Sequence, residues 1–386
     1  MNILYIMRYW PVYGGGETIT VTLANEFVCR GHNVFIAYMY DKFCDLMPYQ
    51  LNKQIHSKKL YTIEHYRNKD VEELHRYIVE NDIDIMINQW GNTSLCFEAK
   101  KNTHCKLITC WHLDVLRKAP KELSGKAKYL RLLLGNNLYE QYNLRKQLKI
   151  HKLNYKFSDR YIFLSPFFVN EYAIYSGIND TQKKISAIAN PLTYHYRYNI
   201  NNYSKKKRNV LFVGRILEYH KRLSYILKIW KNVENNSNFN DWSLTVVGDG
   251  PDIETVKNLA DSLLLRRVFF EGFKDPRSYY EESSVFMMTS AFEGFGMTLL
   301  EAQQYATVPM AMDTYGSLHD IIVNGENGII EPDNALDKYT EDLFRLMNDY
   351  NYRKQLAING LESSQKFSVQ KISDKWILCF NQLVKK

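Results

Sequence analysis

The stretch Val285-Phe-Met-Met-Thr-Ser-Ala-Phe-Glu-Gly-Phe-Gly-Met-Thr-Leu-Leu-Glu301 decides the fold class of this sequence. Its first four residues are typical of a buried strand, two glycines interrupt the chain, and a helix is predicted to follow. A strand that passes through a glycine turn into a helix is the repeating unit of a parallel α/β sheet. The N–H groups at the start of that helix, at Phe295, Gly296, Met297 and Thr298, would attract an anion.

Glu293 precedes the predicted helix and Glu301 lies about one turn inside it, so that both carboxylates can face one ligand. Carboxylates recognise hydroxyls because they accept two bonds from a vicinal diol. A bare pair of glutamates eight positions apart would be an ordinary pair of surface residues. The Gly-Phe-Gly between them favours a site for sugar hydroxyls and a phosphate.

The same alternation of strand and helix extends outward over both halves of the chain. Glycines 14 to 16 and Gly31 bound the first helix, and a length of 386 residues predicts two domains. Strands are predicted at 2–7, 33–38, 83–88, 106–110 and 160–164, then at 210–213, 244–247, 268–271, 285–288 and 308–312; helices are predicted at 18–30 and 71–81.

The polar stretch 190–208 is predicted to connect the two domains. We therefore expect an α/β protein with two Rossmann-like domains that face a central cleft, residues 1–190 and 191–367. A C-terminal helix at 368–386 is expected to cross back onto the first domain. Ligands in such sheets bind beyond the carboxyl ends of the strands.

Composition indicates a folded protein of a reducing compartment. Six cysteines show no paired spacing, and no signal peptide or membrane-spanning stretch is expected, which favours the cytoplasm. The net charge is +8, and residues 1–190 carry the whole excess.

Residues 117–156 alone hold eleven basic groups against Glu122 and Glu140. Leucines at 130, 132, 133, 134, 138 and 144 accompany them. This pattern resembles a basic amphipathic helix that could lie on an anionic membrane surface. A solvated helix face is the plainer alternative, and nucleic acid is the less favoured one, because no nucleic-acid fold signature accompanies the patch.

Two further groups suit a phosphate. Gly14, Gly15 and Gly16 open the first helix, a position that fits a phosphate or an acceptor hydroxyl, although such a turn is often only a turn. Arg215 follows the first strand of the second domain and Lys221 comes six residues later. Together they offer the charge that a diphosphate leaving group needs when no metal is present.

Taken in order, these motifs resemble glycosyltransferase family 4, the retaining GT-B group 1 glycosyltransferases, over most of the chain. The matching stretches are Gly14-Gly-Gly-Glu-Thr, Leu23-Ala-Asn-Glu-Phe, Gly31-His-Asn-Val, Phe212-Val-Gly-Arg215, Val247-Gly-Asp-Gly-Pro251, Glu271-Gly-Phe273, the segment from Glu293 to Glu301, Val308-Pro309 and Asn324-Gly-Glu-Asn-Gly328.

The resemblance implies transfer of a sugar from a nucleotide-diphosphate donor, UDP-sugar being favoured, to a glycan or lipid-linked acceptor in bacterial surface polysaccharide synthesis. It places Glu293 and His112 by the donor sugar, Glu301 at the ribose, and Arg215 with Lys221 at the diphosphate. No metal or other cofactor is expected. Asp82 and Asp84 superficially resemble a metal-binding pair but lie at a helix-to-strand joint, where a capping role is favoured.

The sequence also departs from the family pattern. Pro191, Ala306 and Tyr315 stand where glycines are common, and Lys221 is one residue further from Arg215 than usual. A GT-B nucleotide-sugar epimerase and a silent donor-binding protein are the alternatives. An epimerase would act on the donor alone, and the presence of Glu293, Glu301 and Arg215 disfavours a silent protein.

Overall fold

The computed structural model describes residues 1–11, 14–41, 51–60, 68–89, 91–115, 125–178, 180 and 183–385. The chain divides into two compact units. The first contains Met1–Thr193 and Phe367–Lys386, and the second contains Tyr194–Lys366. The sequence placed the connection at 190–191 and at 367–368.

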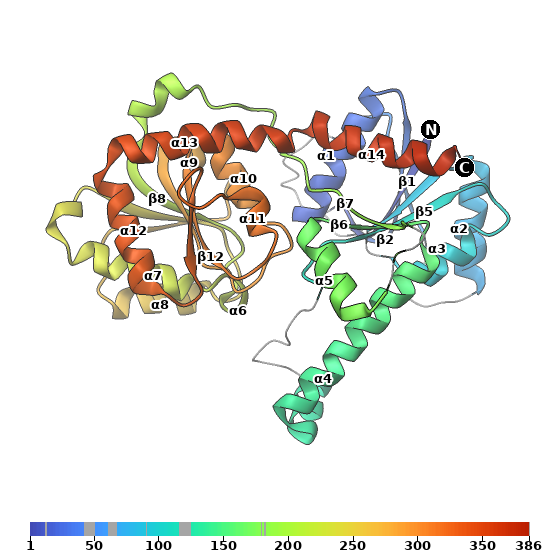
Figure 1. Ribbon diagram of the computed structural model, residues 1–386, viewed down its shortest axis with the longest axis horizontal. Helices are drawn as coiled ribbons and strands as arrows, with labels where there is room; N and C mark the ends of the chain where they lie inside the picture. Colours follow the sequence, from blue (N-terminus) through green and yellow to red (C-terminus); the bar gives the residue numbers. More distant parts are fainter. Residues whose placement is uncertain are drawn as a thin grey trace. The chain divides into compact units, whose positions relative to one another are not determined.

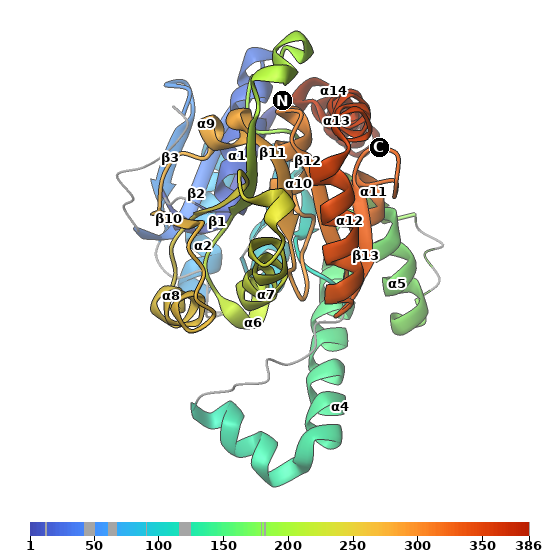
Figure 2. The same cartoon turned by 90° about the vertical axis from the view of Figure 1, so that its left-hand side faces the viewer.

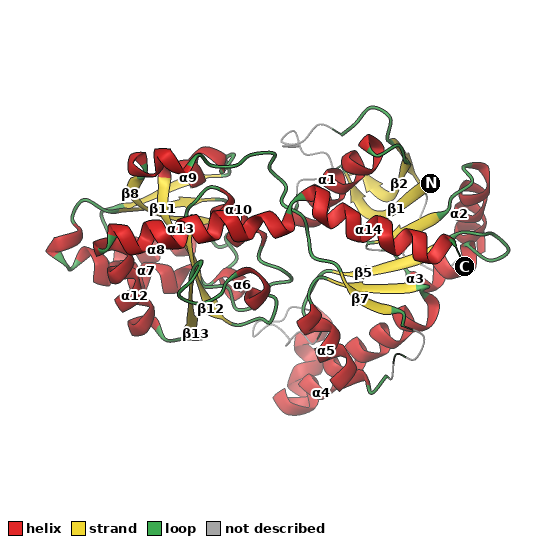
Figure 3. Ribbon diagram, turned by 45° about the horizontal axis from the view of Figure 1, so that its top comes forward, coloured by secondary structure: helices red, strands yellow, loops and turns green. Residues whose placement is uncertain are grey.

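The first unit is built on a parallel sheet in the order β3-β2-β1-β4-β5-β6-β7. Apolar residues of β1, β4 and β5 are fully buried because helices cover both faces of the sheet (Figure 3). The strands are β1 Asn2–Trp10, β2 Asn33–Asp41, β3 His56–Lys59, β4 Ile85–Asn88, β5 Lys106–Trp111, β6 Arg160–Phe163 and β7 Ile185–Ala187. The helices are α1 Gly15–Cys29, α2 Asn68–Glu80, α3 Thr93–Ala99, α4 Gly125–Phe157, α5 Pro166–Ser176 and α14 Val369–Val384.

The C-terminal helix α14 packs on α1 of the first unit, as predicted (Figure 1). Phe27 of α1 meets Phe380 of α14 with ring centroids 5.4 Å apart. Arg30 adds an ion pair with Asp374 at 2.5 Å. The last segment of the chain therefore belongs to the core of the first unit.

Helix α4 differs from the single amphipathic helix expected over 117–156. Gly135, with φ 73° and ψ 165°, breaks it into two helical segments (Figure 2). Only glycine adopts such a backbone conformation without strain. Residues 117–124 of the predicted segment lie outside the described part of the chain.

The second unit repeats the architecture with a parallel sheet in the order β10-β9-β8-β11-β12-β13. Its strands are β8 Lys207–Val213, β9 Ser243–Val247, β10 Val268–Gly272, β11 Ser283–Met288, β12 Val308–Asp313 and β13 Ile329–Pro332. Its helices are α6 Glu218–Lys221, α7 Leu223–Glu234, α8 Ile253–Ser262, α9 Arg277–Glu282, α10 Met297–Gln304, α11 Leu318–Ile321, α12 Leu336–Asn348 and α13 Tyr350–Ser364.

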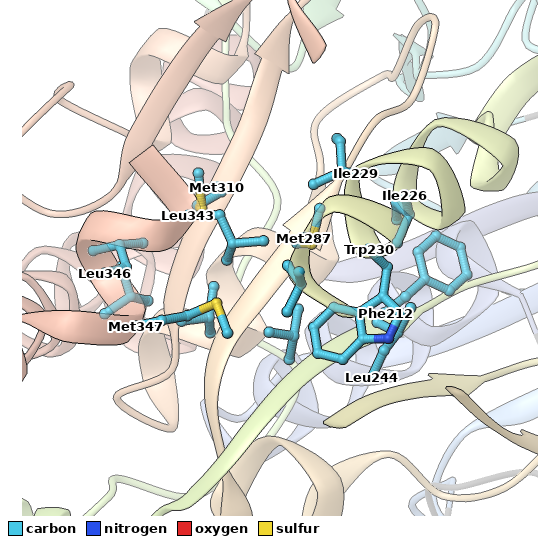
Figure 4. Packing of buried hydrophobic residues seen from close by; sticks show 14 of the residues in the cluster. Phe212, Ile226, Ile229, Trp230, Leu244, Met287, Met310, Leu343, Leu346 and Met347 are labelled. Carbon is cyan, nitrogen blue, oxygen red and sulfur yellow. The ribbon is translucent and has the colours of Figure 1, made fainter. Parts of the chain in front are cut away.

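One apolar cluster fills the face of this sheet that α7 and α12 cover (Figure 4). Trp230 of α7 is fully buried in it, together with Met287 of β11 and Leu343 of α12. Burying one large apolar side chain stabilises the fold by about 1.5–3 kcal/mol. The cluster thus fixes the strands whose carboxyl ends carry the candidate site.

The strands predicted in both halves are present, but β3, β7 and β13 were not predicted. His56-Ser-Lys-Lys59 of β3 is exposed throughout and pairs only with β2. An edge strand of polar residues lacks the apolar pattern by which a strand is recognised. β7 has only three residues, and none of them is fully buried.

Gly248 tests the close approach of the loops that follow β8 and β9. A Cβ at Gly248 would overlap the carbonyl oxygen of Gly214, whereas a Cβ at Gly15 meets nothing within 4 Å. We expect Gly248→Ala to lower the unfolding free energy by about 3 kcal/mol. The melting temperature in scanning calorimetry should fall by about 10 °C. Gly15→Ala is the control, and equal melting temperatures for the two variants would contradict the overlap.

Candidate active site

The loop between β11 and α10 forms a glycine-bounded helix start in the second unit. Gly296 precedes α10 with φ 87°, and a Cβ there would lie 2.6 Å from the Tyr315 hydroxyl. No side chain among the described residues caps α10. The first N–H groups of the helix, around Met297 and Thr298, therefore remain available to an anion.

Glu293 lies in this loop and forms an ion pair with Lys221. Its Oε1 is 2.5 Å from Lys221 Nζ and 3.6 Å from His220 Nε2. The Lys221 and Glu293 side chains are each 12% exposed. Burial opposes ionisation of Glu293, but the charge of Lys221 and the bonds from His220 and Lys221 outweigh it and lower the pKa of Glu293 to about 2. Glu293 is therefore an anion at any physiological pH.

Glu301 lies on α10 and accepts a hydrogen bond of 2.9 Å on Oε2 from the hydroxyl of Tyr280. Burial raises the pKa of Glu301 to about 7, against the smaller opposing effects of Tyr280 and the charge of Lys221. Lys221 thus acts on both glutamates of the motif. The structure brings Glu293, Glu301 and Lys221 together beside the start of α10.

Arg215 lies at the carboxyl end of β8 with its side chain exposed. It has no ion-pair partner within the described ranges of the chain, so its guanidinium can accept a ligand anion. Lys221 differs, because Glu293 already neutralises it. Arg215 can therefore bind a diphosphate with its full charge, whereas Lys221 would share its charge between Glu293 and the diphosphate.

Two residues that the sequence did not single out build the site. Arg222 donates from Nε to the carbonyl of Thr289 at 2.6 Å and from Nη2 to that of Ser290 at 3.0 Å. Tyr280 holds Glu301. Both contacts join segments distant in sequence, and the only local signal is the basic pair at 221–222.

The first unit contains a cavity of about 430 Å³ beyond the carboxyl ends of β4 and β5. Apolar groups make up most of its lining, amide and hydroxyl side chains are interspersed among them, Trp111 adds an aromatic face, and Arg8 is its one charged residue. The lining residues are Arg8, Met39, Asn88, Gln89, Gly91, Asn92, Thr93, Ser94, Thr109, Cys110, Trp111, His112, Leu113, Ile150, Leu153 and Asn154. A mostly apolar, nearly uncharged lining with several amides and hydroxyls fits an uncharged ligand that has both hydroxyls and apolar faces.

His112 lines this cavity, with its Nε2 hydrogen-bonded to Gln89 Oε1. Burial lowers the pKa of His112 to about 4. The imidazole is therefore neutral at physiological pH: Nε2 donates to Gln89, and Nδ1 is the nitrogen that accepts a hydrogen bond.

Gly14, Gly15 and Gly16 lie at the start of α1, as predicted. The Oε2 atom of Glu17 occupies the space that a Cβ on Gly14 would fill. A carboxylate so close repels a phosphate and accepts a bond from a hydroxyl. The geometry favours the hydroxyl of the two ligands considered for this loop.

The Asp84 carboxylate binds the backbone at the start of β1. Its Oδ2 accepts a 2.8 Å bond from the backbone N–H of Asn2, and His104 lies 3.4 Å from Oδ1. Asp82 adopts a left-handed backbone with φ 48° after α2. The pair thus occupies a helix-to-strand joint, where the sequence placed it.

The chain has two parallel α/β units. In the second, two glutamates and a lysine flank a helix start that follows a glycine. These features are those of the GT-B class of sugar-nucleotide enzymes. Residues 198–363 match the family model described as glycosyl transferases group 1. The match lies within the second unit and confirms the resemblance to the group 1 glycosyltransferases, and the chain is an enzyme of the hexosyltransferase type.

Relatives extend the match to almost the whole chain. An uncharacterized glycosyltransferase of Haemophilus influenzae is 23% identical, with 94% of this chain and 95% of that protein covered. An α-1,4-N-acetyl-D-galactosaminyltransferase of Campylobacter jejuni, whose name gives a GalNAc-GalNAc-diNAcBac-PP-undecaprenol substrate, is 23% identical over 94% of each chain.

A solved structure supports the fold. The Anabaena protein HepE in complex with UDP has a TM-score of 0.73 and 17% identity, with 99% of this chain and 100% of that chain covered. At this identity the likeness shows the GT-B fold alone, and it confirms the fold class expected from the sequence.

Glu293→Gln tests the ion pair and the carboxylate together. The substitution removes the charge that neutralises Lys221 and leaves a neutral amide at the site. We expect kcat for sugar transfer to fall by about 100-fold or more, because preorganised electrostatic groups typically contribute that much. Steady-state kinetics measures it, with the exposed Glu254→Gln as control. Turnover of Glu293→Gln within twofold of the parent would contradict a role of Glu293 in sugar transfer.

Proposed function

We propose that the chain transfers a sugar from UDP-sugar, with retention of anomeric configuration, to a glycan on a lipid carrier in bacterial surface polysaccharide synthesis. In this reaction the anomeric carbon–oxygen bond to the diphosphate breaks and a bond to an acceptor hydroxyl forms. The departing diphosphate takes the proton of that hydroxyl. Attack and departure occur on the same face of the sugar.

The cluster of Glu293, Glu301 and Lys221 beside the start of α10 carries this proposal. A diphosphate leaving group gains negative charge as the sugar becomes oxocarbenium-like. Arg215, Lys221 and the N–H groups of α10 would stabilise that charge, so that no metal ion is needed. Glu293 would bind the donor sugar, and Glu301 would accept bonds from the ribose hydroxyls.

The names of relatives support the choice of pathway and acceptor. They include an amylovoran biosynthesis glycosyltransferase of Erwinia amylovora, a poly(glycerol-phosphate) α-glucosyltransferase of Bacillus subtilis and the undecaprenol-linked enzyme of Campylobacter jejuni. The UDP bound to HepE supports a uridine nucleotide. These relatives are transferases, which favours transfer over the epimerase alternative.

The cavity of the first unit is the proposed site for the acceptor glycan. Its amides, hydroxyls and Trp111 suit sugar rings, which present hydroxyls at their edges and C–H groups on their faces. His112 would serve there as a neutral hydrogen-bonding group. Glu17 beside Gly14 would accept a bond from an acceptor hydroxyl.

Helix α4 supports contact with a membrane surface. We call residues 129–142, on both sides of the Gly135 break, the hook, and residues 145–156 the stem. Exposed apolar side chains gather on the hook, where Leu132 is 71% and Leu133 83% exposed. The stem carries Arg145, Lys146, Lys149, Lys152 and Lys156 and no acid, and the flanking acids are Glu140 and Asp159.

Apolar insertion and attraction to anionic headgroups act together at such a surface. Because the apolar and basic groups occupy successive lengths of α4, we propose that the hook enters the leaflet and the stem contacts the headgroups. No helix within the described ranges is both long and apolar enough to cross a membrane. The proposed contact is therefore peripheral.

A donor screen tests the reaction. UDP-, GDP- and ADP-sugars are incubated with the enzyme alone and with a lipid-diphosphate glycan acceptor, in the presence and absence of EDTA. We expect slow hydrolysis of a UDP-sugar alone, an α-linked product from an α-linked donor by NMR, and equal rates with EDTA. Epimerised donor without acceptor would favour the epimerase, and loss of turnover with EDTA would contradict the metal-free mechanism.

Vesicle binding tests the hook. We expect the protein to sediment with vesicles containing anionic phosphatidylglycerol at low salt. The affinity of the double variant Leu132→Ser/Leu133→Ser for these vesicles should be lower by a factor of about ten or more. Leu264→Ser is the matched control, because Leu264 is 74% exposed in the second unit. Equal binding of all three proteins, or binding by none, would remove the membrane proposal.

A further inference from the structure

Tyr280 donates a hydrogen bond to the carboxylate of Glu301. The phenol donates to Oε2 over 2.9 Å, and Tyr280 itself is fully buried. We infer that Tyr280 is a positioning residue, which turns the Glu301 carboxylate so that its other oxygen and remaining lone pairs face the ribose diol of the donor. This inference rests on the proposed binding of a nucleotide at Glu301.

The backbone of Tyr280 is held from two sides. Its carbonyl accepts bonds from Thr307 Oγ1 at 2.6 Å and from Lys206 Nζ at 3.0 Å. Lys206 also donates to the carbonyls of Glu281 and Ser283, at 3.0 and 2.8 Å. A buried lysine with so many acceptors fixes the end of α9 in one position.

The ring of Tyr280 is fixed as well. It stacks on Tyr305, with centroids 5.9 Å apart and planes 21° apart, and meets Phe286 at 5.9 Å. Tyr305 follows α10, the helix that carries Glu301. The direction of the Tyr280 hydroxyl is therefore set by packing on the same helix that it serves.

The chemistry of diol recognition explains why such a bond matters. A carboxylate binds two neighbouring hydroxyls best when it is ionised and cannot rotate. The Tyr280 hydroxyl supports both conditions, because it donates to the ionised form and pins one oxygen. The charge of Lys221 also favours the ionised form of Glu301, whereas burial of Glu301 opposes ionisation. Glu293, beside Lys221, shares that lysine.

Pairs of nucleotides that differ only in the ribose 2′-hydroxyl isolate this role. Calorimetry compares UDP with dUDP, GDP with dGDP and ADP with dADP as ligands of the parent, Tyr280→Phe, Glu301→Ala and Tyr339→Phe. Tyr339→Phe is the matched control, because this buried phenol donates to the carbonyl of Met310 at 2.8 Å in the core. The two Tyr→Phe changes remove the same group.

We expect the parent to prefer the ribonucleotide of one pair by about tenfold, Tyr280→Phe to lose most of that preference, and Tyr339→Phe to keep it. In transfer assays Tyr280→Phe should raise KM for the donor about tenfold with kcat within about twofold. Donor KM should rise as pH falls below about 7, because Glu301 becomes protonated. That rise should begin at higher pH in Tyr280→Phe, which has lost a bond to the ionised form.

The outcomes distinguish failure of nucleotide binding at Glu301 from failure of the positioning role of Tyr280. If Glu301→Ala keeps both nucleotide binding and the ribose preference, Glu301 does not hold the donor and the proposed function fails at this site. If Glu301→Ala loses the preference but Tyr280→Phe keeps it with an unshifted pH profile, the positioning role of Tyr280 is wrong. Equal losses in Tyr280→Phe and Tyr339→Phe would show a general effect on folding and would also overturn the role.

Discussion

The buried ion pair between Lys221 and Glu293 is the interaction on which the candidate site of the second unit depends. Its two side chains come from segments that follow β8 and β11, which are neighbours in the sheet. Removing two charges from water costs several kcal/mol for each ion, and the pair offsets this only with good geometry and additional bonds. His220, at 3.6 Å from Glu293, belongs to the same cluster. The parallel sheet thus brings the two segments close together, and the ion pair fixes the positions of the Lys221 and Glu293 side chains.

Arg222 shows how the chain accommodates the extra residue before Lys221. It adopts a left-handed backbone, φ 49°, between α6 and α7. Its side chain bonds the carbonyls of Thr289 and Ser290, and the Thr289 hydroxyl returns bonds to the carbonyls of Lys221 and Arg222. An unfavourable conformation persists only where its surroundings determine it. Here reciprocal bonds lock α6 to the loop that carries Glu293, which places Lys221 despite its spacing.

The sequence was sufficient to predict the two-unit α/β fold and the position of the two glutamates around the start of a helix, because both depend on local patterns. Apolar runs mark buried strands, and Gly-Phe-Gly between two glutamates marks a helix start. The sequence was insufficient for Tyr280, Lys206 and Arg222, because their roles arise from contacts across 21 to 77 positions. It was also insufficient for α4, where composition predicted a helix but not the break at Gly135. A single glycine inside a helical pattern does not reveal its own φ.

The two glutamates of the motif lie in one cluster yet have opposite pKa shifts, and this difference suits different tasks. Both are buried, which by itself raises the pKa of each. Glu293 contacts Lys221 directly and has a pKa of about 2, whereas Glu301 accepts a hydrogen bond from the Tyr280 phenol and has a pKa of about 7. A permanent anion suits a sugar that becomes positively charged. Recognition of neutral hydroxyls by Glu301 requires its ionised form, which the hydrogen bond from Tyr280 favours and burial opposes. The direct ion pair of Glu293 with Lys221 therefore separates the pKa values, and with them the proposed roles, of the two glutamates.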